Sequence, residues 1–273
     1  MSVVREVRKV GGIEVITQRP AGAARGAPLV FVHGAYVGAW CWDELFLPFL
    51  AARGHACHAL SLRGHGGSRS DAAAAMAGLD EYVEDVANVV GGLDAAPVLI
   101  GHSMGAAVIQ RALRRCPARA AVLMAPVPPE GVMASAWLLA VRDPALFAEI
   151  NLMQHAHPHF GSVETLRRAL FAGAVAPKRL LTYFRLAQPE SPRAILDLSW
   201  PQYSWIAREP GVPVLVLGAE RDMFFPPLLV QSTGRLWGVA PEFFPDLGHA
   251  MMLDEGWEAV AGRIAGWLQE TVS

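Results

Sequence analysis

The chain has few cysteines and no cluster of basic residues. Its three cysteines, Cys41, Cys57 and Cys116, leave one unpaired and lie among apolar residues, so we expect buried free thiols rather than a disulfide framework. Lys and Arg total 23 against 25 Asp and Glu, for a net charge of −2. Because nucleic acids and anionic membranes bind clustered positive charge, we expect neither as a partner. Small neutral molecules fit this composition better.

The N-terminal segment also lacks a long apolar run. Charged residues interrupt positions 1–20 throughout, which leaves no signal-peptide core and no membrane span. We therefore expect a cytoplasmic protein without a membrane span. The sequence leaves the oligomeric state open, a homodimer included.

Length and composition favour one α/β domain that carries an insertion. The 273 residues are 53% apolar, which is enough to fill a large core. Val3–Val10 and Ile13–Gln18 flank a Gly-Gly pair and predict an antiparallel hairpin. Further strands are predicted at 28–32, 56–60, 98–100, 120–126, 212–218 and 242–244, and helices at 43–53, 79–93 and 255–271. In the second of these helices, the predicted solvent-facing residues are Glu81, Glu84 and Asp85, opposite an apolar face.

The motif around which this pattern is arranged is Gly101-His102-Ser103-Met104-Gly105. An apolar run precedes it, and apolar residues at helical spacing follow it. A G-x-S-x-G sequence between a strand and a helix is typical of the nucleophile elbow of the α/β-hydrolases. The flanking glycines are required because neighbouring backbone comes too close for side chains. Ser103 is therefore the predicted nucleophile.

Two further segments extend this similarity. The run HGAYVGAWCWDELFLPFLAARGH, residues 33–55, resembles the opening of the plant methyl esterases and hydroxynitrile lyases, a branch of the α/β-hydrolase superfamily. SLRGHGGS, residues 61–68, resembles a loop found in many superfamily members. The resemblance implies an α/β-hydrolase fold, a mostly parallel doubly wound sheet with an inserted helical cap. We expect residues 1–126 and 210–273 to form the core and residues 127–209 the cap, where prolines, aromatics and short helical patterns replace the alternation of strand and helix.

The resemblance also implies the partners of the serine. Asp222 follows a predicted strand in a G-x-x-D pattern and is the expected acid, with Glu220 as the competing candidate. His249 lies in the loop expected to carry the base. The chain order of serine, aspartate and histidine is that of the hydrolases. The backbone N–H groups of Ala35 and Met104 are the expected oxyanion hole.

Other histidines have structural interpretations. We expect His33 to hold the loop of Ala35 through side-chain hydrogen bonds, and His65 to be structural. His155, His157 and His159 raise the question of a metal site. Their alternating spacing around a proline, without a neighbouring carboxylate or cysteine, favours a polar cap loop. We expect no metal and no other cofactor.

Together these residues predict a serine hydrolase that cleaves small to medium apolar carboxylic esters through an acyl-enzyme. Hydroxynitrile lyases of this branch have a lysine after the catalytic histidine and a threonine after the first core strand, where this chain has Ala250 and Ala35. A serine at the elbow argues against dehalogenases and epoxide hydrolases, which use aspartate there. Lactone, thioester and peracid chemistry use the same three residues, so the sequence does not separate them from ester hydrolysis. A non-catalytic receptor for small ligands is the alternative of a different class.

Overall fold

A single mixed sheet forms the centre of the protein. The computed structural model describes residues 2–155, 162–204, 206 and 211–272, and within these residues eight strands pair in the order β1-β2-β4-β3-β5-β6-β7-β8. The strands are β1 (Val3–Val10), β2 (Ile13–Pro20), β3 (Leu29–Val32), β4 (Cys57–Leu60), β5 (Val98–His102), β6 (Ala120–Met124), β7 (Val214–Ala219) and β8 (Glu242–Phe244). The first two form the predicted hairpin, and β2 joins β4 antiparallel. All other pairs are parallel, so the predicted fold class is confirmed.

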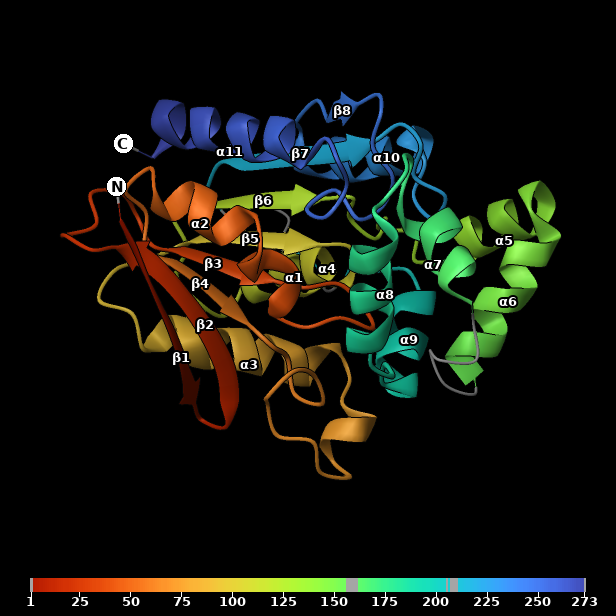
Figure 1. Ribbon diagram of the computed structural model, residues 1–273, viewed down its shortest axis with the longest axis horizontal. Helices are drawn as coiled ribbons and strands as arrows, with labels where there is room; N and C mark the ends of the chain where they lie inside the picture. The colour runs from red at the N-terminus through yellow and green to blue at the C-terminus, as the bar shows by residue number, and fades with distance from the viewer. Residues whose placement is uncertain (1, 156–161, 205, 207–210, 273) are drawn as a thin grey trace.

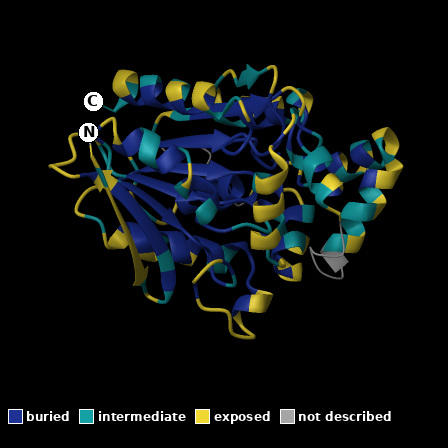
Figure 2. Ribbon diagram, in the orientation of Figure 1, coloured by how far each residue is buried: buried dark blue, intermediate teal, exposed yellow. Residues whose placement is uncertain are grey.

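Helices cover both faces of the sheet (Figure 1). On one face lie α1 (Trp40–Asp43), α2 (Phe46–Ala51) and α11 (Trp257–Thr271), and on the other lie α3 (Leu79–Gly91), α4 (Met104–Ala112) and α10 (Pro227–Trp237). Successive side chains of a strand alternate between these layers: Phe31 packs with the first and Val30 with the second. The central strands are therefore buried throughout, as Figure 2 shows.

The helix predicted over residues 43–53 is shorter in the structure: α2 covers Phe46–Ala51, and the separate helix α1 ends at Asp43. The chain breaks at Leu45, whose φ and ψ of −124° and −55° lie outside the helical range. Pro48 has no N–H to donate, and its ring would clash with the carbonyl group of Glu44 inside a continuous helix. Starting α2 at Phe46 puts Pro48 in the first turn, where N–H groups have no intrahelical acceptor.

The predicted exposure of Asp85 is wrong. Its side chain is buried and forms an ion pair with Arg63, with 2.7 Å between Arg63 Nη2 and Asp85 Oδ1. The backbone N–H of Arg63 donates to the same carboxylate at 2.9 Å. Two neighbouring positions on α3 that were expected to be solvent-facing, Glu81 and Glu84, are less buried. Asp85 thus anchors the loop that follows β4.

The described residues between β6 and β7 form five helices, which we call the inserted helices. They are α5 (Met133–Arg142), α6 (Pro144–His155), α7 (Val163–Leu170), α8 (Pro177–Leu186) and α9 (Pro192–Ser199). In Figure 1 the arrowheads of β6 and β7 point toward them, so they lie at the carboxyl end of the parallel sheet. Ligands of open α/β sheets bind at this end. Among all described helices, none is long and apolar enough to cross a membrane.

Candidate active site

Ser103 lies in a sharp turn between β5 and α4. Its φ and ψ are 54° and −118°, in a region that residues with a Cβ rarely adopt. The turn is held because the backbone N–H of Ser103 donates to Met124 O at 2.9 Å and its carbonyl oxygen accepts from Ala106 N at 3.0 Å. The serine therefore lies at the carboxyl end of the sheet and at the start of a helix.

The glycines on either side of Ser103 are required by close backbone contacts, as predicted. A Cβ on Gly105 would lie 2.3 Å from Val32 O, and one on Gly101 would lie 2.6 Å from Gly105 O. Both contacts are with main-chain atoms, which cannot rotate away. The turn can therefore be this tight only with glycine at both positions.

These contacts predict that Gly105→Ala destabilises the protein by about 3 kcal/mol, because β3 or α4 must shift to admit the methyl group. Gly91→Ala is the matched control. Gly91 is also a helical glycine, but nothing lies within 4 Å of its added Cβ. This control is expected to be neutral or more stable by up to about 1 kcal/mol. Urea unfolding measures both, and equal stabilities of the two variants would contradict the close packing at the elbow.

Ser103, His249 and Asp222 come together although they are far apart in the sequence. His249 Nε2 lies 3.0 Å from Ser103 Oγ, and His249 Nδ1 lies 2.8 Å from Asp222 Oδ2. An ionised carboxylate only accepts hydrogen bonds, so Nδ1 carries the proton and Nε2 is left to accept from the serine hydroxyl. All three side chains are buried. This arrangement can take a proton from Ser103.

The carboxylate of Asp222 is held in its charged form. Burial alone would raise its pKa, but His249 and the backbone N–H groups of Phe224 and Phe225 more than offset this and lower the pKa. These two N–H groups donate to Oδ1 at 2.7 and 2.9 Å, which leaves Oδ2 for the imidazole. The rings of Phe224 and Phe225 meet the imidazole of His249 at steep angles. Glu220, the competing candidate, is exposed.

The two expected oxyanion donors belong to residues near Ser103. Ala35 and Met104 both line the cavity that Ser103 opens into. Met104 is the first residue of α4, where an N–H has no acceptor within the helix. Gly34 brings the Ala35 loop close, since a Cβ there would lie 3.2 Å from Ser103 Cβ.

His33 holds this loop from the side of the core, as expected. Its Nδ1 donates to Gly34 O at 2.7 Å, and its Nε2 accepts from Leu62 N at 3.0 Å. Burial, and then the neighbouring His65, lower the pKa of His33 to about 3, so the ring is neutral. A neutral imidazole supplies the one donor and one acceptor that these two contacts need.

The loop of His249 is held by three residues, His102, Asp254 and Leu170, that the sequence did not predict for this role. His102 Nε2 donates to the carbonyl oxygen of His249 at 2.8 Å, and burial followed by His249 lowers the pKa of His102 to about 3. The buried carboxylate of Asp254 accepts from Gly248 N at 2.9 Å and from Ala172 N at 3.1 Å. On the inserted helices, Leu170 O accepts from Ala250 N at 2.8 Å. The loop is therefore fixed both to the elbow and to the inserted helices.

A cavity of about 280 Å³ lies between Ser103 and the inserted helices. Apolar side chains make up most of its wall, and every inserted helix contributes to it. The large apolar side chains of residues 127–209 divide between this wall and the surface. Leu139, Phe147, Met153 and Phe171 line the cavity, whereas Trp137, Leu181, Trp200 and Tyr203 are exposed.

The tryptophans, cysteines and candidate metal ligands lie in different parts of the structure. Trp42 is buried in the core against Phe31, whereas Trp40 lines the cavity and stacks on Tyr183. Cys41 and Cys57 are buried free thiols, and Cys116 is partly buried. Of the candidate metal ligands, His157 and His159 lie outside the described residues. Among the residues that are described, no three His, Cys, Asp or Glu side chains are grouped as metal ligands.

The chain is similar in sequence to several known proteins. The chain resembles a non-heme chloroperoxidase of Streptomyces lividans, with 40% identity over 112 residues, which is 40% of each chain. It also resembles methylesterase 2 of Arabidopsis thaliana, with 34% identity over 95 residues, 34% of this chain and 36% of that protein. The expected resemblance to the plant methyl esterases is thus confirmed. The alignments span only 36–40% of these relatives' own lengths.

Similarity of the fold extends further than similarity of sequence. A thermophilic esterase from Thermogutta terrifontis, solved with malate bound, superposes with a TM-score of 0.74 over 100% of both chains at 19% identity. At such an identity the likeness establishes the fold alone. The sequence model of the alpha/beta hydrolase family matches residues 29–263, most of the chain. The protein therefore belongs to the alpha/beta hydrolase family.

Proposed function

We propose that the protein is a carboxylesterase-type serine hydrolase of small to medium apolar esters, with Ser103, His249 and Asp222 as its catalytic triad. The observation that carries the proposal is the continuous chain of contacts from Ser103 Oγ to His249 Nε2, at 3.0 Å, and from His249 Nδ1 to Asp222 Oδ2, at 2.8 Å. A nucleophile, a base and an orienting carboxylate in this order are what acyl transfer needs.

In the proposed mechanism, His249 takes the proton of Ser103 as Oγ attacks the ester carbonyl carbon. The N–H groups of Ala35 and Met104 stabilise the tetrahedral oxyanion. The imidazolium then gives its proton to the departing alcohol, and an acyl-enzyme remains. Water, activated by His249, hydrolyses the acyl-enzyme. Asp222 keeps the imidazole in the reactive tautomer and stabilises its charged form.

The wall of the cavity supports the substrate class. Residues 127–209 act in this proposal as a cap whose apolar side chains exclude water and receive an apolar acyl or alcohol group. Ala250, beside the proposed base, is buried and lines the cavity. An alanine there cannot supply the charge that a lysine would place beside a cyanide leaving group, which favours ester cleavage over cyanohydrin cleavage.

The substrate prediction is tested with p-nitrophenyl esters of matched length. Butyrate is expected to be hydrolysed with a kcat/KM at least about 100-fold above that of a hemisuccinate, because the apolar wall offers no partner to a second carboxylate and leaving it unpaired costs about 3 kcal/mol or more. Equal rates for the two esters would contradict an apolar acyl site.

The same assay separates the alternatives. A lactone, an acyl thioester, and a carboxylic acid with hydrogen peroxide are offered beside the esters. Faster turnover of one of these would replace ester hydrolysis by that activity while keeping the triad. If the protein hydrolyses nothing and resists a fluorophosphonate probe, yet binds small apolar ligands tightly, the enzyme proposal is wrong and the receptor alternative replaces it.

A further inference from the structure

Glu190 is a buried carboxylate in the segment between α8 and α9. Its Oε1 accepts from the hydroxyl of Tyr82 at 2.6 Å and from Ser191 N at 2.8 Å. Its Oε2 lies 3.1 Å from His65 Nε2 and accepts from Tyr36 N at 3.4 Å. The segment between α8 and α9 thus contacts the core loops of His65 and Tyr36 through one side chain that is 0% exposed.

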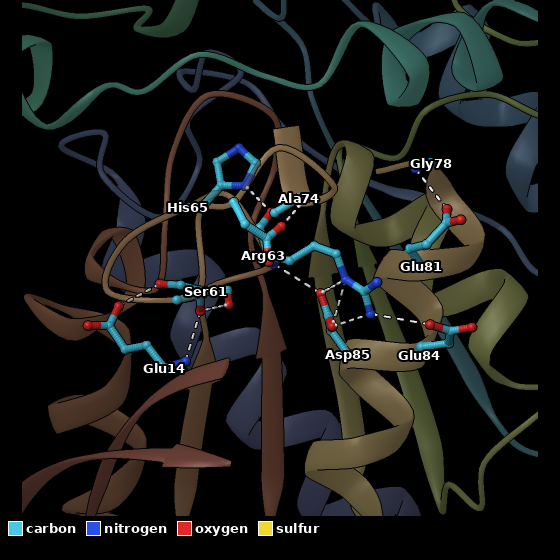
Figure 3. A network of polar contacts seen from close by, with 11 residues as sticks. Glu14, Ser61, Arg63, His65, Ala74, Gly78, Glu81, Glu84 and Asp85 are labelled. Carbon is cyan, nitrogen blue, oxygen red and sulfur yellow. Dashed lines mark hydrogen bonds and ion pairs between the residues drawn. The ribbon is translucent and has the colours of Figure 1, made fainter. Parts of the chain in front are cut away.

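The loop of His65 is a fixed support for this carboxylate. Arg63 in the same loop pairs with Asp85 of α3, and the hydroxyl of Ser61 donates to Glu14 Oε1 at 2.7 Å. Figure 3 shows these contacts on either side of the loop, with the imidazole of His65 pointing away from the Arg63–Asp85 pair. The position of His65, and through it that of Glu190, is therefore set by the core.

The contact between His65 and Glu190 is an ion pair. His65 Nδ1 lies 3.2 Å from Arg63 O, and its Nε2 lies 3.1 Å from Glu190 Oε2, within ion-pair distance although not in hydrogen-bonding geometry. Burial lowers the pKa of His65, but Glu190 more than offsets this and raises it. Burial likewise raises the pKa of Glu190, and His65 with the surrounding donors lowers it. Both side chains are buried, so breaking the pair would leave each charge without its oppositely charged partner, and the pair therefore holds its geometry tightly.

Tyr36, which follows the proposed oxyanion donor Ala35, has a strained backbone. Its φ is 65°, an outlier for a bulky side chain. Residues 188–190 hold this residue on both sides: Tyr36 O accepts from Gln188 N at 2.8 Å, and Tyr36 N donates to Glu190. The side-chain Oε1 of Gln188 also accepts from Gly66 N at 2.6 Å. Strained conformations persist only where the surroundings impose them.

We propose that Glu190 is a positioning residue for the oxyanion hole. It keeps Tyr36 in its left-handed conformation and thereby aims the N–H of Ala35 at the substrate carbonyl oxygen. The inference rests on the proposed function, since it presupposes an oxyanion. The inserted helices then do more than cover the cavity, because they complete the geometry of the loop that stabilises the transition state.

The test is Glu190→Gln, which keeps the shape of the side chain but removes its charge. We expect kcat for the butyrate ester to fall on the order of 10- to 100-fold with KM within about threefold, a smaller loss than removal of an oxyanion donor. Affinity for a trifluoromethyl ketone, whose adduct with Ser103 carries an oxyanion, is expected to fall by the same factor. Binding of the product alcohol, which has no carbonyl or carboxylate oxygen to occupy the oxyanion hole, is expected to stay unchanged.

Arg193→Gln is the matched control. Arg193 of α9 pairs with Glu81 of α3 at 3.4 Å, so it also links the inserted helices to the core, but at the exposed surface and away from Tyr36. It is expected to keep wild-type kcat and ketone affinity. If Glu190→Gln does not fold, Tyr82→Phe, which removes one donor to the same carboxylate, is expected to give a smaller loss of the same pattern.

The outcomes are distinct. The positioning role is overturned if Glu190→Gln, like Arg193→Gln, retains wild-type kcat and ketone affinity. It is also overturned if Glu190→Gln loses affinity for the ketone and for the product alcohol equally. In both cases the esterase proposal stands. If instead the wild-type protein neither turns over esters nor reacts with the ketone, both proposals fall.

Discussion

Ser103→Ala is expected to lower kcat for the butyrate ester by about 10⁵- to 10⁶-fold, because the hydroxyl that His249 would deprotonate, and that would carry the acyl group, is gone. The alanine keeps a Cβ in the turn, so the variant should unfold at the same urea concentration as the wild type. The cavity wall is untouched, and binding of the product acid should persist. Steady-state kinetics and urea unfolding measure these properties on the same preparations.

A fluorophosphonate probe tests the same nucleophile without knowledge of the substrate. The wild type should be labelled and Ser103→Ala should not. Ser135→Ala is the matched control: Ser135 lines the same cavity, but its hydroxyl donates to Val132 O at 2.8 Å, whereas that of Ser103 lies against His249. It should still be labelled. Labelling that survives loss of Ser103 would place the nucleophile elsewhere.

Asp222→Asn is expected to lower kcat by about 10⁴-fold with little change in KM. The amide of asparagine can donate to His249 Nδ1, which would put the ring proton on Nε2, facing Ser103. The base then has no lone pair for the serine proton. The backbone N–H groups of Phe224 and Phe225 can still donate to the remaining amide oxygen, so the loop should stay folded.

Glu220→Gln is the control for this second prediction. Glu220 is an exposed carboxylate two residues before Asp222 in the same loop, and it was the competing candidate for the acid. Its loss should leave kcat within about twofold of the wild type, as is usual for surface substitutions. A large effect of Glu220→Gln with little effect of Asp222→Asn would exchange the two assignments.

The parts of the fold that could be predicted are those encoded by neighbouring residues. The elbow was recognisable because a tight turn needs glycine at fixed distances from Ser103, and the structure contains the close contacts that require them. Local signals could also have corrected one prediction and added another. Pro48 indicates that the helix predicted over residues 43–53 begins later, and Pro226-Pro227 indicates the start of α10, which was not predicted.

The unpredicted residues depend on partners that are distant in the sequence. Asp85 looks like part of a solvated helix face until Arg63, 22 residues earlier, is placed beside it. Glu190 stands among polar and proline residues, and Asp254 follows Met251, Met252 and Leu253, so neither has a sequence pattern that marks it as a buried carboxylate with a role. His102 reaches a carbonyl group 147 residues away. Since a carboxylate or imidazole has no local pattern when buried, only the assembled fold reveals these roles.

The way in which the inserted helices are attached limits how such a protein can acquire a new specificity. Transplanting residues 127–209 from another family member would exchange the cavity wall. It would also replace Leu170, Ala172 and Gln188, whose main-chain atoms hold the loops of His249 and Tyr36, together with the carboxylate of Glu190. Changes confined to wall positions such as Leu139 and Phe147 leave all of these anchors in place. Point substitutions in the cavity wall can therefore change specificity without disturbing the contacts that position the two loops, whereas exchange of the whole segment would replace those contacts.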